Sequence, residues 1–196
     1  MSALTPSLGR PTLADRLVAR SLVSDALLVV GGAAFVGLLA QVAIPLWPVP
    51  ITGQTLAVLL VGSTLGALRG VLAMVVYAVV GIAGVPWFSD ASAGLQVVAG
   101  PTGGYIIGFI LAAGLTGWLA QRNWDRRVLG AFASFSAGTL ITFAIGLPWL
   151  AASLGLNLDE TLQAGLYPFI LGGVIKALLA AGIIPLAWKL TSRPKH

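Results

Sequence analysis

Cysteine is absent from this chain of 196 residues, and its one histidine is the final residue. Disulfides, zinc thiolates and thiol nucleophiles are therefore excluded, and a single histidine assembles neither a metal cluster nor a catalytic triad. Charge is scarce too, because charged residues make up 9% of the chain against about 25% in ordinary soluble domains. Such a chain cannot cover a water-facing surface, so the sequence excludes a soluble fold.

Apolar residues make up 58% of the chain, with a mean hydropathy of +0.97, and they fall in runs of about 20 residues, the length that crosses a bilayer. We predict an all-α polytopic membrane protein with six transmembrane helices, at about 24–44, 52–68, 70–86, 103–120, 129–149 and 167–189. The first run is too long for the core of a signal peptide and is taken as a retained span. Residues 1–23 and 191–196 then flank one transmembrane domain, 24–190.

The basic residues predict the orientation. Except for Lys176, every lysine and arginine precedes span one, follows span six, or lies between spans two and three or four and five. The positive-inside rule makes this side cytoplasmic and places both termini there. The net charge of +5 does not indicate a nucleic-acid partner, because these charges bracket the apolar runs instead of forming a stripe.

Tryptophans lie at both predicted membrane surfaces. Trp47, Trp87 and Trp149 fall at outer ends, each beside a proline, and the other three fall at inner ends: Trp118, Trp124 and Trp188. One interpretation is two belts of interfacial anchors. The other is that the three outer helix ends converge on an aromatic pocket that faces outward.

Lys176 is the one cation within a predicted span, roughly 13 Å below its outer start at 1.5 Å per residue. A lysine at such depth costs about 2.5–3.5 kcal/mol and faces a cavity or a partner in most membrane proteins. No span core contains Asp or Glu, so a ligand carboxylate arriving from outside is one candidate partner. Snorkelling towards the interface and deprotonation on burial are the alternatives.

Two connections add neutral polar groups. The segment 48–55 carries Thr52 and Gln54, which suit an uncharged polar ligand group but also an ordinary helix start. The glycine-rich connection from Ser89 to Gly104 is either a lid or a simple link. Intramembrane acid pairs and a nucleotide-binding motif are both missing, which disfavours a membrane enzyme and leaves any pumping to the ATPase of a partner.

Four segments together resemble the BioY family of biotin transporters: 48–55 (PVPITGQT), 84–89 (GVPWFS), 100–105 (GPTGGY) and 168–177 (PFILGGVIKA). The likeness covers about residues 24–190. It implies the substrate-binding S component of an energy-coupling factor (ECF) transporter in the bacterial inner membrane. Such a component is not an enzyme, has no cofactor or metal, and binds biotin with high affinity from outside as its transported substrate.

The resemblance also implies site residues. The family's last helix reads Asp-x-x-Lys at the biotin site; here Lys176 matches the lysine, and Gly173 replaces the aspartate. A polar contact from the loop after span three carries over to Ser89 or Asp90. With the candidates above, the expected ligand contacts are Lys176, Gly173, Ser89, Asp90, Trp87, Gln54, Thr52, Tyr105 and Trp149.

The resemblance implies a transmembrane coupling protein and ABC-type ATPases as partners, besides membrane lipid. The small pair Ala33 and Gly37 on span one is a candidate interface with that partner, and packing inside the bundle is the alternative. Three questions stay open. The first is whether the chain transports alone, as a homo-oligomer or only with an energising module. The others are whether the ligand is another carboxylated vitamin, and whether the chain is instead a non-transport membrane subunit.

Overall fold

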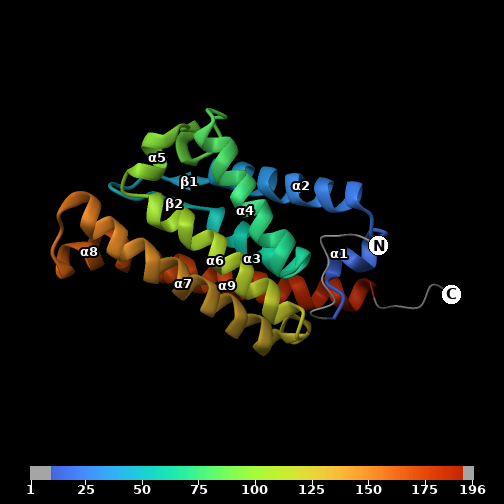
Figure 1. Cartoon of the computed structure of the whole chain (residues 1–196). Helices are drawn as coiled ribbons and strands as arrows, with labels where there is room; N and C mark the ends of the chain where they lie inside the picture. The colour runs from blue at the N-terminus through green and yellow to red at the C-terminus, as the bar shows by residue number, and fades with distance from the viewer. Residues whose placement is uncertain (1–9, 192–196) are drawn as a thin grey trace.

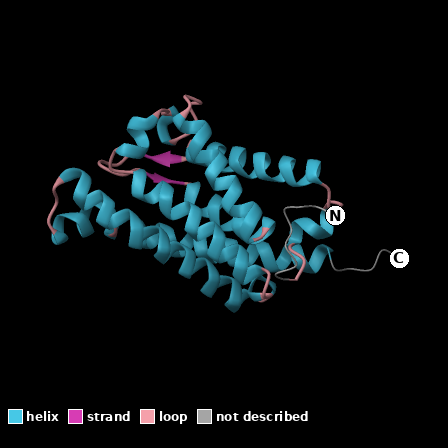
Figure 2. Cartoon of the chain, viewed as in Figure 1, coloured by secondary structure: helices cyan, strands magenta, loops and turns pink. Residues whose placement is uncertain are grey.

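The computed structural model describes residues 10–191, and within them helices dominate (Figure 2). The α-helices are α1 (Leu13–Leu17), α2 (Leu22–Ala40), α3 (Gln54–Leu65), α4 (Ala67–Ile82), α5 (Leu95–Ala99), α6 (Gly103–Ala120), α7 (Val128–Leu154), α8 (Leu158–Gly165) and α9 (Tyr167–Thr191). Two short 3₁₀ turns, η1 (Ser89–Ala91) and η2 (Trp124–Arg126), and a two-stranded antiparallel hairpin, β1 (Ala43–Ile44) with β2 (Ile51–Thr52), complete the described elements.

Each of the six predicted spans coincides with a helix, but the helices differ in length. α2, α6, α7 and α9 are long and apolar enough to cross a membrane, whereas α3 has 12 residues and α4 has 16. At 1.5 Å per residue α3 is about 18 Å long, shorter than a hydrocarbon core of about 30 Å. Four membrane-spanning candidates are therefore established in the described chain, and the count of six remains a prediction.

The connections hold most of the structure that the sequence did not predict. Span one was expected to continue to residue 44, but α2 ends at Ala40 and the chain turns into β1. The 89–104 connection contains η1 and α5, and α8 follows α7. α3 and α4 separate at Gly66, whose φ of 86° is a conformation that glycine adopts without a steric penalty.

α6 forms the centre of the bundle, between α4 and α7 (Figure 1). Two thirds of its apolar window (67%) is buried, against 28% for α9. Small residues bring the helices together: a Cβ atom on Gly62 of α3 would lie 2.8 Å from the Cα of Ala113 of α6. Close backbone approach of this kind is how membrane helices gain packing energy without a hydrophobic driving force.

α9 turns a row of leucines outward, each more than half exposed: Leu171, Leu178, Leu179 and Leu186. A continuous apolar exterior is unusual for soluble proteins, and it matches helices that are solvated by lipid. The exterior therefore agrees with the membrane class that composition predicts.

Three ion pairs, two of them buried, connect the elements at the basic end. Arg69 of α4 pairs with Asp15 of α1 at 2.6 Å and with Asp25 of α2 at 3.2 Å, and Arg20 pairs with Asp15 at 2.9 Å. Burial of Asp15 acts against its charged form, but hydrogen bonds from Arg20, Thr12 and Arg69 outweigh it and lower the pKa of Asp15 to about 2. Part of the segment predicted as a plain cytoplasmic extension is thus a folded piece of the bundle.

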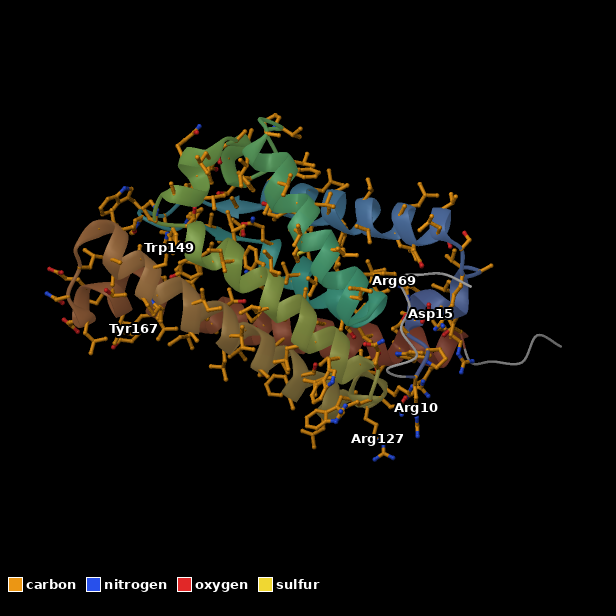
Figure 3. All side chains as sticks on the ribbon, in the orientation of Figure 1. Arg10, Asp15, Arg69, Arg127, Trp149 and Tyr167 are labelled. Atoms are coloured by element: carbon orange, nitrogen blue, oxygen red, sulfur yellow. The ribbon has the colours of Figure 1, made fainter. Side chains whose placement is uncertain are left out.

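Figure 3 shows Arg10, Asp15, Arg69 and Arg127 at one end of the bundle and Trp149 and Tyr167 at the other. This separation is the one that the positive-inside argument requires, while the location of the termini stays a prediction. Arg193, Lys195 and the predicted tail beyond residue 191 lie outside the described residues.

The tryptophans are not all interfacial anchors. Trp47 is 84% exposed, as an anchor at the lipid surface should be. Trp188, expected at the inner surface, is instead buried and donates a hydrogen bond of 2.6 Å from Nε1 to Oδ2 of Asp125 in η2. The indole therefore joins the end of α9 to the α6–α7 connection.

Candidate ligand-binding site

A pocket lies at the end of the bundle opposite the ion pairs, where the β-hairpin, η1, α5 and the helices α3, α6, α7 and α9 meet. It encloses about 50 Å³. Its lining is mixed, with one cation, several neutral polar groups and many apolar side chains: Val49, Pro50, Thr52, Gln54, Thr55, Phe88, Ser89, Val97, Thr102, Tyr105, Ile106, Phe109, Thr142, Phe143, Phe169 and Lys176. Five of the predicted ligand contacts are among them: Thr52, Gln54, Ser89, Tyr105 and Lys176.

Lys176 supplies the positive charge of this pocket. Its Nζ donates hydrogen bonds to the backbone carbonyl of Thr52 and to Oγ1 of Thr55, the latter at 2.9 Å. Both acceptors are neutral, and the ion pairs between described residues lie at the other end of the molecule. The ammonium is thus held in position without a balancing carboxylate, and a ligand anion can supply that charge.

The side chain of Gln54 is fixed by its neighbours at the start of α3. Thr52 Oγ1 donates to Gln54 Oε1 at 2.7 Å, and Gln54 Nε2 donates to the hydroxyl of Tyr77 at 2.6 Å. These bonds orient the amide and leave one N–H and further acceptor capacity for a ligand. Tyr77, which the sequence analysis did not single out, therefore positions a pocket group from outside the lining.

Phenylalanines and a tyrosine form the aromatic wall. The ring of Phe143 in α7 lies 5.9 Å from Tyr105 of α6 and 5.9 Å from Phe169 of α9, both edge-to-face. The hydroxyl of Tyr105 is turned away, donating to the carbonyl of Gly165 at 3.0 Å. Of this wall, only Tyr105 was predicted from the sequence. Phe109, four residues further along α6, lies on the same helix face and was the available signal.

Neither Trp87 nor Trp149, two of the expected ligand contacts, lines the pocket. The Trp87 indole packs 5.4 Å from the Tyr77 ring and donates to the carbonyl of Tyr77 at 2.9 Å. Trp149 donates to the carbonyl of Gly100 at 2.9 Å, which ties α7 to the loop before α6. The N–H group of each indole is therefore already committed to a backbone carbonyl.

The loop after α4 is held by Gln41. Its Nε2 donates to the carbonyls of Phe88 and Gly37, at 3.0 and 3.1 Å, and its Oε1 accepts from the backbone N–H of Ala91. Ser89 of this loop reaches the pocket, whereas Asp90 is exposed outside it with a left-handed φ of 56°. Of the two predicted alternatives, the structure therefore places Ser89 in the same pocket as Lys176 and leaves Asp90 outside that pocket.

Gly173 lies beside the pocket, in an apolar groove between α7 and α9 that shares Phe143 and Phe169 with it. A Cβ atom at this position would meet only Thr139 Cγ2, at 3.7 Å, an ordinary contact. Because residues three apart on a helix are neighbours, a carboxylate at 173 could reach Lys176. The structure therefore has room for an aspartate side chain at position 173.

The candidate partner interface faces inward in this structure. Ala33 is fully buried, and a Cβ atom on Gly37 would lie 3.1 Å from the Trp87 side chain. Gly31, on the same helix, is exposed, with no atom within 4 Å of its Cβ position. The small pair therefore packs within its own bundle, which is the alternative that the sequence left open.

Comparison with known proteins identifies the family of this chain. A model of the BioY family matches residues 11–193 of this chain. The chain belongs to the BioY family. It is 35% identical over 152 residues to the biotin transporter BioY of Rhizobium etli, covering 74% of this chain and 81% of that protein. It is 36% identical over 159 residues to the biotin transporter BioY of Thermotoga maritima, covering 81% and 88% respectively.

The fold of this BioY-family chain also matches a solved structure, the crystal structure of the S-component for biotin from an ECF-type ABC transporter. The TM-score is 0.79 at 24% sequence identity, and the alignment covers 88% of this chain and 94% of the other. At that identity the likeness establishes the fold, so the function rests on the family and on the pocket.

Proposed function

We propose that this BioY-family protein binds biotin in the pocket around Lys176 and carries it across the membrane. The proposal rests chiefly on one observation: an ammonium held by neutral partners in a pocket whose walls are otherwise apolar or neutral polar. The curated relatives carry the name biotin transporter, and biotin combines a carboxylate, a neutral ureido ring and an apolar thioether ring. Each group has a matching partner in the lining.

The proposed pose places the valerate carboxylate at Lys176. A charge-assisted hydrogen bond is about twice as strong as a neutral one, and burial strengthens it further. The ureido ring takes hydrogen bonds from Gln54 and Thr52 or Ser89, while Tyr105 and the phenylalanines contact the thioether ring. Trp87, Trp149 and Asp90 act from outside the pocket in this pose.

Entry of biotin requires the pocket to expand. The enclosed space of about 50 Å³ is well below the roughly 300–1,000 Å³ of small-molecule sites. The segment from Phe88 to Thr102 supplies one wall and contains only η1 and α5 as short elements. We infer that this segment moves outward to admit the ligand and closes over it afterwards, which is the lid role considered for the 89–104 connection.

The transport assembly is part of the proposal. The chain acts as the substrate-binding S component, with six spans in the bacterial inner membrane and both termini in the cytoplasm. A transmembrane coupling protein and ABC-type ATPases supply the energy. The S-component fold supports this assignment. Uptake measured with and without such a module tests whether the chain also transports alone.

A binding assay on purified protein tests the ligand. We expect saturable binding of radiolabelled biotin, loss of at least tenfold in affinity, about 1.4 kcal/mol, for Lys176→Ala, and no change for Lys189→Ala at the exposed end of α9. Unchanged affinity in Lys176→Ala would refute the pose. Competition by an unrelated carboxylated vitamin but not by biotin would identify a different substrate, and absence of any binding would favour a non-transport subunit.

A further inference from the structure

A second cleft lies at the basic end of the molecule, outside the ligand pocket. It is an open hollow of about 620 Å³ between the residues before α1 and the α6–α7 connection. Its lining is unusually rich in arginine: Arg10, Arg122, Asn123, Trp124, Arg126, Arg127, Leu129 and Gly130. Figure 3 shows Arg10 and Arg127 at this end.

Most of the positive charge of this cleft is not balanced by the described residues: Asp125 lies near Arg126, and no ion pair is found for Arg10, Arg122 or Arg127. Among residues 10–191, the ion pairs found use Arg20 and Arg69, not the cleft arginines. The one acid in the connection, Asp125, is 1% exposed and accepts the hydrogen bond of the Trp188 indole. A concentration of unpaired guanidinium groups attracts an anion.

Stacking holds two of these guanidinium groups in place. Arg122 lies 3.8 Å from the centre of the Trp118 ring, and Arg126 lies 4.4 Å from the centre of the Trp188 ring. The Nε atom of Arg126 is buried and has no hydrogen-bond partner within the described chain. Fixed guanidinium planes with free donors are the arrangement that recognises phosphate.

The start of α7 adds to the same site. Helix α7 has 27 residues, its N-cap is Arg127, and it has neither a side-chain cap nor an acidic residue in its first turn. The N-terminus of a helix carries partial positive charge, so arginine there is unfavourable unless an anion is present. The uncapped N–H groups of the first turn are donors for such an anion.

Apolar side chains border the arginines. Leu129 is 79% exposed, Val128 60% and Trp124 46%. A soluble phosphate compound has no apolar part to pack against these side chains, whereas the acyl chains of a lipid can pack against them. Basic pockets on the cytoplasmic side of membrane proteins bind acidic head groups. We propose that this cleft binds one anionic phospholipid, with its phosphate on Arg122, Arg126 and Arg127 and an acyl chain along Leu129.

Native mass spectrometry of the detergent-purified chain tests this site. We expect retention of dioleoylphosphatidylglycerol at concentrations at least tenfold below those needed for dioleoylphosphatidylcholine. The double variant Arg122→Gln/Arg127→Gln should lose that preference. Lys189→Gln, which removes an exposed positive charge elsewhere at the same end, should keep it.

Three results would overturn the proposal. Equal loss in Lys189→Gln would indicate general charge attraction, and equal retention of phosphatidylcholine would indicate ordinary lipid solvation. Equally tight binding of inorganic phosphate would indicate a soluble-anion site.

Leu129→Asn provides an independent check that keeps every arginine. It should weaken dioleoylphosphatidylglycerol severalfold but leave the short-chain dihexanoyl lipid unchanged, and equal effects on both would also contradict an acyl contact.

Discussion

Buried cations have different kinds of partner at the two ends of this bundle. At the basic end, Arg69 is surrounded by the carboxylates of Asp15 and Asp25, so the charges are balanced within the chain. At the pocket end, Lys176 has only the carbonyl of Thr52 and the hydroxyl of Thr55. A balanced cluster stabilises a fold, whereas an ammonium with neutral partners is available to a ligand. The difference fits a structural role for the first end and the proposed ligand-binding role for the second.

The largest expected effect comes from removing the cation of the balanced cluster. Arg69→Ala removes the buried guanidinium that pairs with both Asp15 and Asp25, while Asp15 keeps its ion pair with Arg20; breaking a buried pair in this way costs about 3–5 kcal/mol. Thermal unfolding in detergent should show a greatly lowered midpoint. Lys176→Met is the matched change at the other end and should leave the midpoint nearly unchanged or raise it. Similar losses in both variants would remove the distinction between the two ends.

The second-largest effect is expected from overpacking α2 against Trp87. Gly37→Leu drives a side chain into Trp87, and overpacking of this kind costs about 1–3 kcal/mol. We expect weaker biotin binding, because Trp87 contacts Tyr77 and Tyr77 orients Gln54. Gly31→Leu, on the exposed face of the same helix, should bind biotin normally. Normal binding by Gly37→Leu together with loss of uptake would instead support an interface with a partner.

The pH dependence of stability sharpens the comparison at the basic end. Burial raises the pKa of Asp125 to about 6 despite the Trp188 hydrogen bond and the nearby charge of Arg126. The folded state therefore holds this proton more tightly than the unfolded state, so stability from this group is greatest below about pH 4 and is lost as pH rises towards 6. Two pKa units correspond to about 2–3 kcal/mol.

Asp125→Asn tests this dependence, because the amide cannot titrate. The loss of stability between pH 4 and 6 should disappear when unfolding midpoints are measured across that interval. Asp15, whose pKa is lowered to about 2, contributes in the opposite sense, and its stabilisation is lost only as pH falls from about 4 towards 2. A decline between pH 4 and 6 that survives in Asp125→Asn would assign it to another group.

The smallest expected effect is at Gly173. Gly173→Asp places a carboxylate one helical turn from Lys176, and it adds a charge-assisted acceptor for the ligand. We expect biotin to bind up to tenfold more tightly in equilibrium measurements, while Gly173→Asn, of similar size but neutral, gains less. Weaker binding by the aspartate variant would mean that it competes with the ligand carboxylate for the ammonium. No change in either variant would place residue 173 outside the site.

Hydropathy located the helices well but not the elements between them. The apolar runs matched α2, α3, α4, α6, α7 and α9, because a long apolar segment in lipid must satisfy its backbone bonds within itself. The hairpin and the short helices α5 and α8 had no comparable signal, since a two-residue strand depends on its partner strand. The folded segment around Asp15 was missed for the same reason: its ion pair joins residues 54 positions apart.

The candidate site was predicted in part. Lys176, Gln54 and Thr52 were identifiable because polar groups in an apolar chain are conspicuous and costly. Phe143 and Phe169 were not, because a phenylalanine in a uniformly apolar helix looks the same whether it faces lipid or a pocket. Trp87 and Trp149 were predicted as ligand contacts, but neither lines the pocket, and their N–H groups bond to backbone carbonyls.

The sequence by itself determined that this chain belongs in a membrane, which segments become helices, and that one cation is buried among them, because these follow from the composition of single segments. Only the tertiary structure decided what that cation meets: Lys176 and its acceptor Thr52 are 124 residues apart. The rotation of each apolar helix is set by packing against its neighbours, through small residues such as Gly62, and not by its own hydrophobic pattern. Helix packing therefore decides whether a lysine in such a helix faces a pocket or the lipid.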